Sequence, residues 1–249
     1  MWIRVVSLRS ERARMLYFFG LILVAILLLA PHRSAARAQG PVHRYTGPVY
    51  RVVTKEPAMA LTINVVWGTE YVPEILKTLT KDRVKATFML GGAWASGHPA
   101  LVRDLFQAGM ELGNHGYAHR HVSMLSYQEN LNEIERTNTA VGTITGSLPK
   151  VFAPPYGEFN QTVLKAAAAA NMPLIMWTID TIDWRASSSA AIIANRVLTR
   201  LAPGSIVLMH PTERTAAALP ELISALQQRG YHLVTVSQLL TMGQPTGDG

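Results

Sequence analysis

Apolar and polar positions after residue 57 alternate between two periods. Short apolar runs typical of buried strands are followed by longer stretches in which apolar residues recur at helical spacing. Strands are expected at 58–67, 84–90, 111–114, 151–153, 173–179, 205–209 and 231–236, and helices at 71–81, 99–108, 127–143, 159–170, 188–201, 215–229 and 237–242. Strict alternation of this kind indicates a parallel sheet covered by helices.

The number of strand–helix units narrows the fold class. Repeated units of this kind favour a closed or nearly closed α/β barrel, so we expect a distorted (β/α) barrel of about seven strands. A doubly wound open sheet is the alternative.

The N-terminal pattern is of a different kind. Residues 1–14 are basic, residues 15–30 are an uncharged apolar run, and Ala36-Arg37-Ala38 follows. This order is typical of a secretory signal, although an uncleaved membrane anchor begins in the same way and the run is short for a span. We therefore expect an exported protein, secreted or held at the membrane, with a leader at 1–38, a linker with one strand at 39–57, the barrel domain at 58–242 and a tail at 243–249.

Composition excludes several function classes. The net charge is +7, but the leader carries six arginines against one glutamate, which leaves only +2 for the remaining chain. A nearly neutral body argues against nucleic-acid binding, which requires a basic face. The chain has no cysteine, so disulfides, thiolate metal sites and cysteine nucleophiles are excluded. Neither observation bears on the oligomeric state.

Unusual polar and aromatic residues follow the ends of five different expected strands. Active sites of parallel α/β folds lie at the carboxyl ends of the strands, so these side chains are expected to meet there. In chain order they are Asn64 and Trp67, His115 and His119, Pro155 and Tyr156, Asp180, Asp183 and Trp184, and His210.

These residues suggest metal chemistry combined with acid catalysis. His115 and His119 have the spacing of a metal-binding pair, which alone is a weak signal, and imidazole suits zinc, cobalt or nickel. His210 could protonate a leaving amine while Asp183 orients its ring. The alternatives are a turn role for His210, a cap or turn role for Asp180, and simple packing for the tryptophans.

At these residues the chain resembles the polysaccharide deacetylase family, also called the NodB-homology or carbohydrate esterase family 4. Its sporulation-associated peptidoglycan or chitin deacetylase-like subgroup is the nearest match, over about residues 58–241. The motifs in family order are Ala60–Asn64 with Trp67-Gly68, Val84–Phe88, Gly113–His119, Pro154–Gly157, Asp180–Trp184 and Ile206–His210. The resemblance implies metal-dependent N-deacetylation of N-acetylated amino sugars in a glycan polymer, with His115 and His119 as metal ligands and Asp183 and His210 as the acid half.

The chain departs from the family pattern at the other half of the site. Asn64 stands where the family has its general base, Val65 where it has a third metal ligand, and Ala153 where it has an arginine that pairs with the base. Losing the carboxylate together with the arginine removes both members of a charge pair, whose survivor would otherwise be an unpaired buried charge. Glu70 and Glu158 are the nearby carboxylates that could replace the base.

Two functions follow from this combination. The first is a cell-wall glycan deacetylase with a divalent cation, zinc or else cobalt or nickel, bound weakly by His115 and His119. The second is a catalytically weak or inactive relative that binds glycan during envelope or spore assembly. In both, the partner is a peptidoglycan or chitin-like polymer, and Trp67, Pro155, Tyr156 and Trp184 are expected to contact it. Contact with the membrane is expected only through residues 15–30.

Overall fold

The structure, a computed structural model, describes residues 47–247. The expected leader and the first part of the expected linker lie outside that range. Within residues 47–247, no helix has the length and apolar character needed to cross a membrane.

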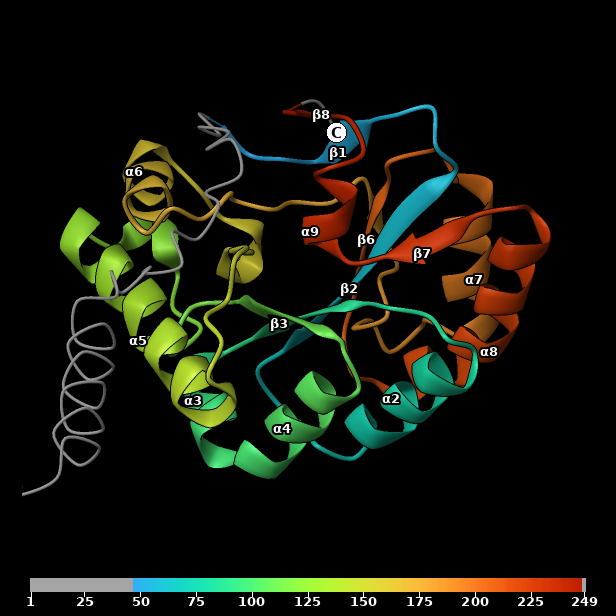
Figure 1. The fold of residues 1–249 in the computed structure, drawn as a ribbon, viewed down its shortest axis with the longest axis horizontal. Coiled ribbons are helices and arrows are strands. Elements are labelled where there is room, and N and C mark those ends of the chain that lie inside the picture. The colour runs from blue at the N-terminus through green and yellow to red at the C-terminus, as the bar shows by residue number, and fades with distance from the viewer. Residues whose placement is uncertain (1–46, 248–249) are drawn as a thin grey trace, which may run out of the picture. The chain divides into compact units, whose positions relative to one another are not determined.

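A parallel sheet forms the centre of the part of the chain that the structure describes (Figure 1). Strand β2 (Ala58–Val65) is its axis and pairs with β3 (Thr87–Leu90) and β7 (His232–Val234) along one edge and with β6 (Ile206–Met209) along the other. Beyond these neighbours lie β4 (Glu111–Asn114) and β5 (Ile179–Asp180), so that the order is β4-β3-β2-β6-β5. All pairings in this sheet are parallel, as the alternating pattern predicts.

Single bridges close this sheet into a distorted barrel. Phe152 bridges Asn114 on one side and Leu174 on the other, and residue 174 begins the segment that leads into β5. The expected strands at 151–153 and 173–179 are therefore wrong in extent, because only these bridges and β5 remain. The physical reason is proline, which lacks a ladder N–H: Pro154 and Pro155 follow the first segment, and Pro173 opens the second.

Six helices cover the sheet close to their expected positions. In contact order around it they are α7 (Ala190–Thr199), α8 (Glu213–Gln228), α2 (Val72–Lys81), α4 (Pro99–Gln107), α5 (Tyr127–Thr145) and α6 (Gln161–Ala169) (Figure 1). The expected tail helix is shorter and forms α9 (Val236–Leu239). Short elements that the pattern does not predict are α3 (Gly92–Gly97), η1 (Val122–Met124) and η2 (Pro155–Gly157).

The alternation of side chains along β2 determines the direction in which its last residues point. Met59, Leu61, Ile63 and Val65 belong to the large apolar cluster that the strands share with the helices. Ala58 and Ala60 belong to a second cluster on the other face of the strand. Because side chains alternate along a strand, Thr62 and Asn64 share this second, inner face. Asn64 therefore points into the barrel, whereas Val65 packs among apolar side chains on the opposite face.

Packing extends beyond residues 58–242 on both sides. Strand β1 (Arg51–Val53) pairs antiparallel with β8 (Gln244–Thr246), and Val49 and Val52 are buried in the inner cluster. Gly204 fixes this packing, since a β-carbon there would lie 1.6 Å from the carbonyl oxygen of Val52. The last part of the expected linker and the first part of the expected tail therefore belong to the barrel unit.

Candidate active site

The two histidines of the Gly113–His119 stretch converge at the carboxyl end of β4. Their ring centroids are 5.1 Å apart, with planes tilted by 58°. His115 is buried, and its Nδ1 lies 2.7 Å from the carbonyl oxygen of Ala153. A carbonyl only accepts hydrogen bonds, so Nδ1 carries the proton and Nε2 of the neutral ring keeps a free lone pair. The structure thus brings the predicted pair together, with one ligand-competent nitrogen on His115.

Helix α5 holds the loop that carries these histidines. The buried carboxylate of Glu133 accepts hydrogen bonds from the backbone N–H groups of Tyr117 and Ala118, at 2.9 and 2.8 Å. Asn114 accepts another from the backbone of Gly116 at 2.9 Å. Glu133 is absent from the predicted site. Its signal in the sequence is a charged residue on the buried face of an amphipathic helix, next to Ile134.

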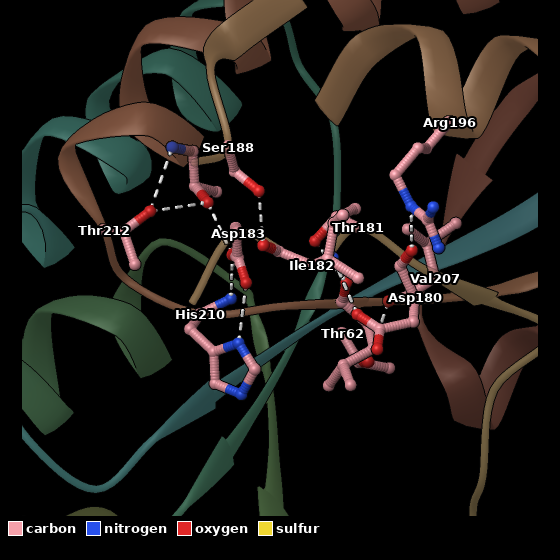
Figure 2. A network of polar contacts seen from close by, with 12 residues as sticks. Thr62, Asp180, Thr181, Ile182, Asp183, Ser188, Arg196, Val207, His210 and Thr212 are labelled. Carbon is pink, nitrogen blue, oxygen red and sulfur yellow. Dashed lines mark hydrogen bonds and ion pairs between the residues drawn. The ribbon is translucent and has the colours of Figure 1, made fainter. Parts of the chain in front are cut away.

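The predicted acid pair is in contact. Asp183 is fully buried, and its Oδ1 lies 2.8 Å from Nδ1 of His210. Its Oδ2 accepts hydrogen bonds from the backbone N–H of His210 at 2.5 Å and from the Thr215 hydroxyl at 2.6 Å. Figure 2 shows His210 below Asp183, with its ring and backbone nitrogens both facing the carboxylate. This arrangement places the proton of a neutral imidazole on Nδ1 and leaves Nε2 as the reactive nitrogen.

Asn64 lies beside His210 at the end of β2. Ile63 pairs with Met209, so the next residues of the two parallel strands, Asn64 and His210, are level. Asn64 is 4% exposed, and its Oδ1 is buried without a hydrogen-bond partner among residues 47–247. A buried unpaired acceptor costs about 1–3 kcal/mol, so such an atom in a cleft indicates a missing donor.

Aromatic side chains surround this end of the barrel. Trp67 stacks on the ring of His210 with centroids 5.3 Å apart, and Tyr156 packs between His119 and His121 at 4.4 and 4.2 Å. Both are about half exposed. Pro155 is buried, and a β-carbon on Gly116 would lie 3.2 Å from it. Trp184 is also exposed, but the contact recorded for its ring is with the guanidinium of Arg185, 4.8 Å away.

Electrostatics keep the two histidines neutral. Burial lowers the pKa of His115 to about 3, against a smaller opposing effect of its bond to Ala153. Burial, and then the charge of His210, lowers the pKa of His119. Neutral imidazole is the form that binds metal ions.

The two carboxylates proposed as substitute bases are engaged elsewhere. Hydrogen bonds from Ser123 and then from His121 hold the pKa of Glu158 below its usual range. The backbone N–H groups of Glu70 and Thr69 lower the pKa of the exposed Glu70 carboxyl. A lowered pKa makes a carboxylate a weaker base, whereas a general base at neutral pH needs a raised one.

The residues present do not fit the three-ligand cation site of a catalytic zinc enzyme. Among residues 47–247, no group of three or more histidine, cysteine, aspartate or glutamate side chains could hold a metal ion. Catalytic zinc is held by three protein ligands and keeps one open position. His115 and His119 supply two, and Val65 lies in the apolar cluster on the far face of β2.

Comparison with known proteins gives a consistent result. The family model described as polysaccharide deacetylase matches residues 51–175. Protein YlxY of Bacillus subtilis is 39% identical over 78% of this chain and 60% of its own length, so the chain spans less than two thirds of that relative. The peptidoglycan-N-acetylglucosamine deacetylase of Bacillus cereus is 34% identical over 73% of this chain and 67% of its own length.

Solved structures extend the likeness to the fold. Wild-type BA3943 of Bacillus anthracis, described as a family 4 carbohydrate esterase pseudoenzyme, has a TM-score of 0.77 and 39% identity, covering 80% of this chain and 70% of its own. A mutant of BA3943 with restored enzymatic activity has a TM-score of 0.77 and 37% identity over 80% and 73% of the two chains. Together with the barrel and the convergent histidines, these matches show that the chain belongs to the polysaccharide deacetylase family.

Proposed function

We propose that this chain binds N-acetylated amino sugars of a cell-wall glycan, of the peptidoglycan or chitin-like class, and deacetylates them far more slowly than relatives with a complete site. The observation that carries the proposal is Asn64, whose buried Oδ1 has no hydrogen-bond partner within residues 47–247. A carboxamide cannot act as a base, but its oxygen can accept the N–H of a sugar acetamide.

The binding half of the proposal rests on the aromatic surface. Trp67 and Tyr156 are half exposed and lie against His210 and His119, respectively. Amphipathic aromatic rings that border a cleft with a few polar groups suit a sugar ring, and Trp184 adds a further exposed face. The peptidoglycan deacetylases among its relatives support this class of ligand.

The slow rate in the proposal rests on Asn64 and Val65, which stand where the family has its general base and its third metal ligand. The family reaction uses a divalent cation, a general base and a general acid. Here only the acid half, Asp183 with His210, has the hydrogen bonds that its role requires. Glu158 and Glu70 are weakened as bases by their own hydrogen bonds. Losing a general base alone reduces rates about 10²–10⁴-fold, which is the scale of the reduction we expect.

A specific observation supports the slow deacetylation in this proposal. The Asp183–His210 pair is intact, and Nε2 of the neutral His115 remains free. We propose that His115 and His119 bind zinc, cobalt or nickel weakly. Export, by the leader expected at residues 1–38, would place the chain with its glycan; contact with the membrane and a role in sporulation are further parts of this proposal.

The test compares binding with turnover on one ligand series. Calorimetry of the purified chain with N-acetylglucosamine oligomers and with the matching glucosamine oligomers measures discrimination, and acetate release measures turnover. We expect preference for the acetylated series, weaker binding by Trp67→Ala, and acetate release near background. Equal affinity for both series would overturn acetamide recognition, and acetate release at the rate of the Bacillus cereus relative would overturn the loss of the base.

A further inference from the structure

We propose that Ser188 and the left-handed backbone at Ile182 form a positioning device that holds the carboxylate of Asp183 on His210. The inference rests on the role proposed for His210. Ser188 lies outside the family motifs, and Ile182 lies within one of them but does not contact His210. Neither Ser188 nor Ile182 reaches the glycan site directly, so both are positioning residues.

The first observation is the backbone of Ile182, which has φ +53°. A left-handed conformation is unfavourable for a β-branched residue, because its Cβ substituents crowd the following peptide. Strain of this kind persists only where surrounding contacts over-determine it, and it concentrates at functional sites. Ile182 is the residue immediately before Asp183, so the turn sets the direction in which that carboxylate leaves the chain.

The second observation is the set of hydrogen bonds that hold the turn (Figure 2). Oδ1 of Asp180 accepts the backbone N–H of Ile182 at 2.7 Å, which is the turn role weighed for this aspartate. The buried hydroxyl of Ser188 donates to the carbonyl oxygen of Ile182 at 2.6 Å. Arg196 donates to the carbonyl oxygen of Asp180 at 2.7 Å, and Thr181 donates to that of Leu208 at 2.8 Å. Both peptide groups of Ile182 are therefore fixed by side chains.

The third observation is the change of direction that the turn produces. Asp183 is fully buried and faces His210 and Thr215, whereas the next residue, Trp184, is half exposed. Ser188 comes from the segment before α7 and reaches back across the loop to the peptide that precedes Asp183. The carbonyl oxygen of Ile182 also accepts the backbone N–H of Arg185, at 3.0 Å. Removing the Ser188 hydroxyl takes away the shorter of these two bonds at the strained residue, so the turn can relax and carry Asp183 away from His210.

Three adjacent serines provide matched controls. Ser187 is exposed, Ser188 bonds Ile182, and Ser189 caps α7 by accepting the backbone N–H of Ile192 at 3.3 Å. Ser187→Ala should change nothing. Ser189→Ala should lower Tm through loss of the cap without touching the turn. Ser188→Ala should weaken the hydrogen bond between Asp183 and His210. Ser188→Thr, which keeps a hydroxyl, should weaken it less.

The readout is the Nδ1–H proton of His210 in the full chain labelled with ¹⁵N-histidine, because this proton lies in the bond to Asp183. In the wild type we expect a downfield, exchange-protected resonance. Ser188→Ala should exchange it at least tenfold faster, while Ser187→Ala and Ser189→Ala leave it unchanged. Unchanged exchange in folded Ser188→Ala, or an equal effect of Ser189→Ala, would overturn the proposal.

A second pair of variants covers the case in which Ser188→Ala does not fold. Asp180→Ala removes the acceptor for the backbone of Ile182, whereas Asp180→Asn keeps an oxygen there. The proposal requires faster exchange of the His210 Nδ1–H proton in Asp180→Ala and near wild-type exchange in Asp180→Asn. Equal exchange in both variants would contradict it. No glycan is present in these measurements, so their failure is distinguishable from failure of the proposed function.

Discussion

His115 donates a hydrogen bond from Nδ1 to the backbone carbonyl of Ala153. Ala153 thus orients the first histidine of the site through its main chain. Because the acceptor is a main-chain oxygen, this contact does not depend on the side chain at position 153.

The burial of His115 predicts a pH-dependent stability. The pKa of this histidine is about 3 in the folded chain and about 6.5 when it is exposed by unfolding. Between these values unfolding takes up a proton, so the free energy of unfolding is fully present above pH 6.5 and falls as pH decreases toward 3. The slope is about 1.4 kcal/mol per pH unit for one proton.

Urea denaturation in metal-free buffer from pH 4 to 7 measures this slope. The variant His115→Gln should flatten it, because glutamine does not titrate. His232→Gln, at an exposed position on β7, should leave it unchanged. A wild-type slope retained in His115→Gln would show that other groups are responsible.

Metal affinity should be weak and should depend on both convergent histidines. Two imidazoles cannot supply the three protein ligands of a catalytic zinc site, so titration with zinc or cobalt should give an affinity well below that of complete relatives. His115→Ala and His119→Ala should each abolish it, and His232→Ala should not. Tight binding that persists in His119→Ala would contradict the assignment of this pair.

Glu133 should determine the shape of the histidine loop. Its carboxylate accepts hydrogen bonds from two backbone N–H groups of that loop, both partly buried, so Glu133→Ala removes their acceptor and should destabilise the fold by about 1–3 kcal/mol. It should also weaken cobalt binding by the histidines. Glu135→Ala, on the exposed side of the same helix, is the control. Equal Tm values for the two variants would remove Glu133 from this role.

Much of the fold is predictable because its helices bury one face each, whereas its central strands are buried on both faces and read as continuous apolar runs. The strands that became β2, β4 and β6 and the six covering helices lie close to their expected positions, since period and burial agree there. The short segments around Phe152 and Leu174 were overestimated, because apolar runs do not reveal how many ladder bonds the flanking prolines leave. The pairing of β1 with β8 joins the two ends of the body, and local pattern has no signal for so distant a contact.

The site residues that lie at the carboxyl ends of strands were predictable from the sequence. The proximity of His115 to His119 and of Asp183 to His210 follows from that rule. Glu133, Ser188 and the strain at Ile182 do not, because they act from a helix face or through a backbone angle. The side of β2 on which Val65 packs becomes evident only from the two core clusters.

The most direct test is acetate release from one N-acetylglucosamine oligomer by the wild type, by each of the single variants Asn64→Asp, Val65→Asp and Ala153→Arg, and by the triple variant that combines them. Asn64→Asp alone should add little, because neither an arginine nor a third ligand supports its carboxylate. The triple variant should exceed the sum of the single changes, with coupling of about 0.5–3 kcal/mol between contacting residues. Its Tm must be measured alongside, since Val65→Asp places a carboxylate in an apolar cluster. A wild type as active as the triple variant would contradict the loss of the base at Asn64.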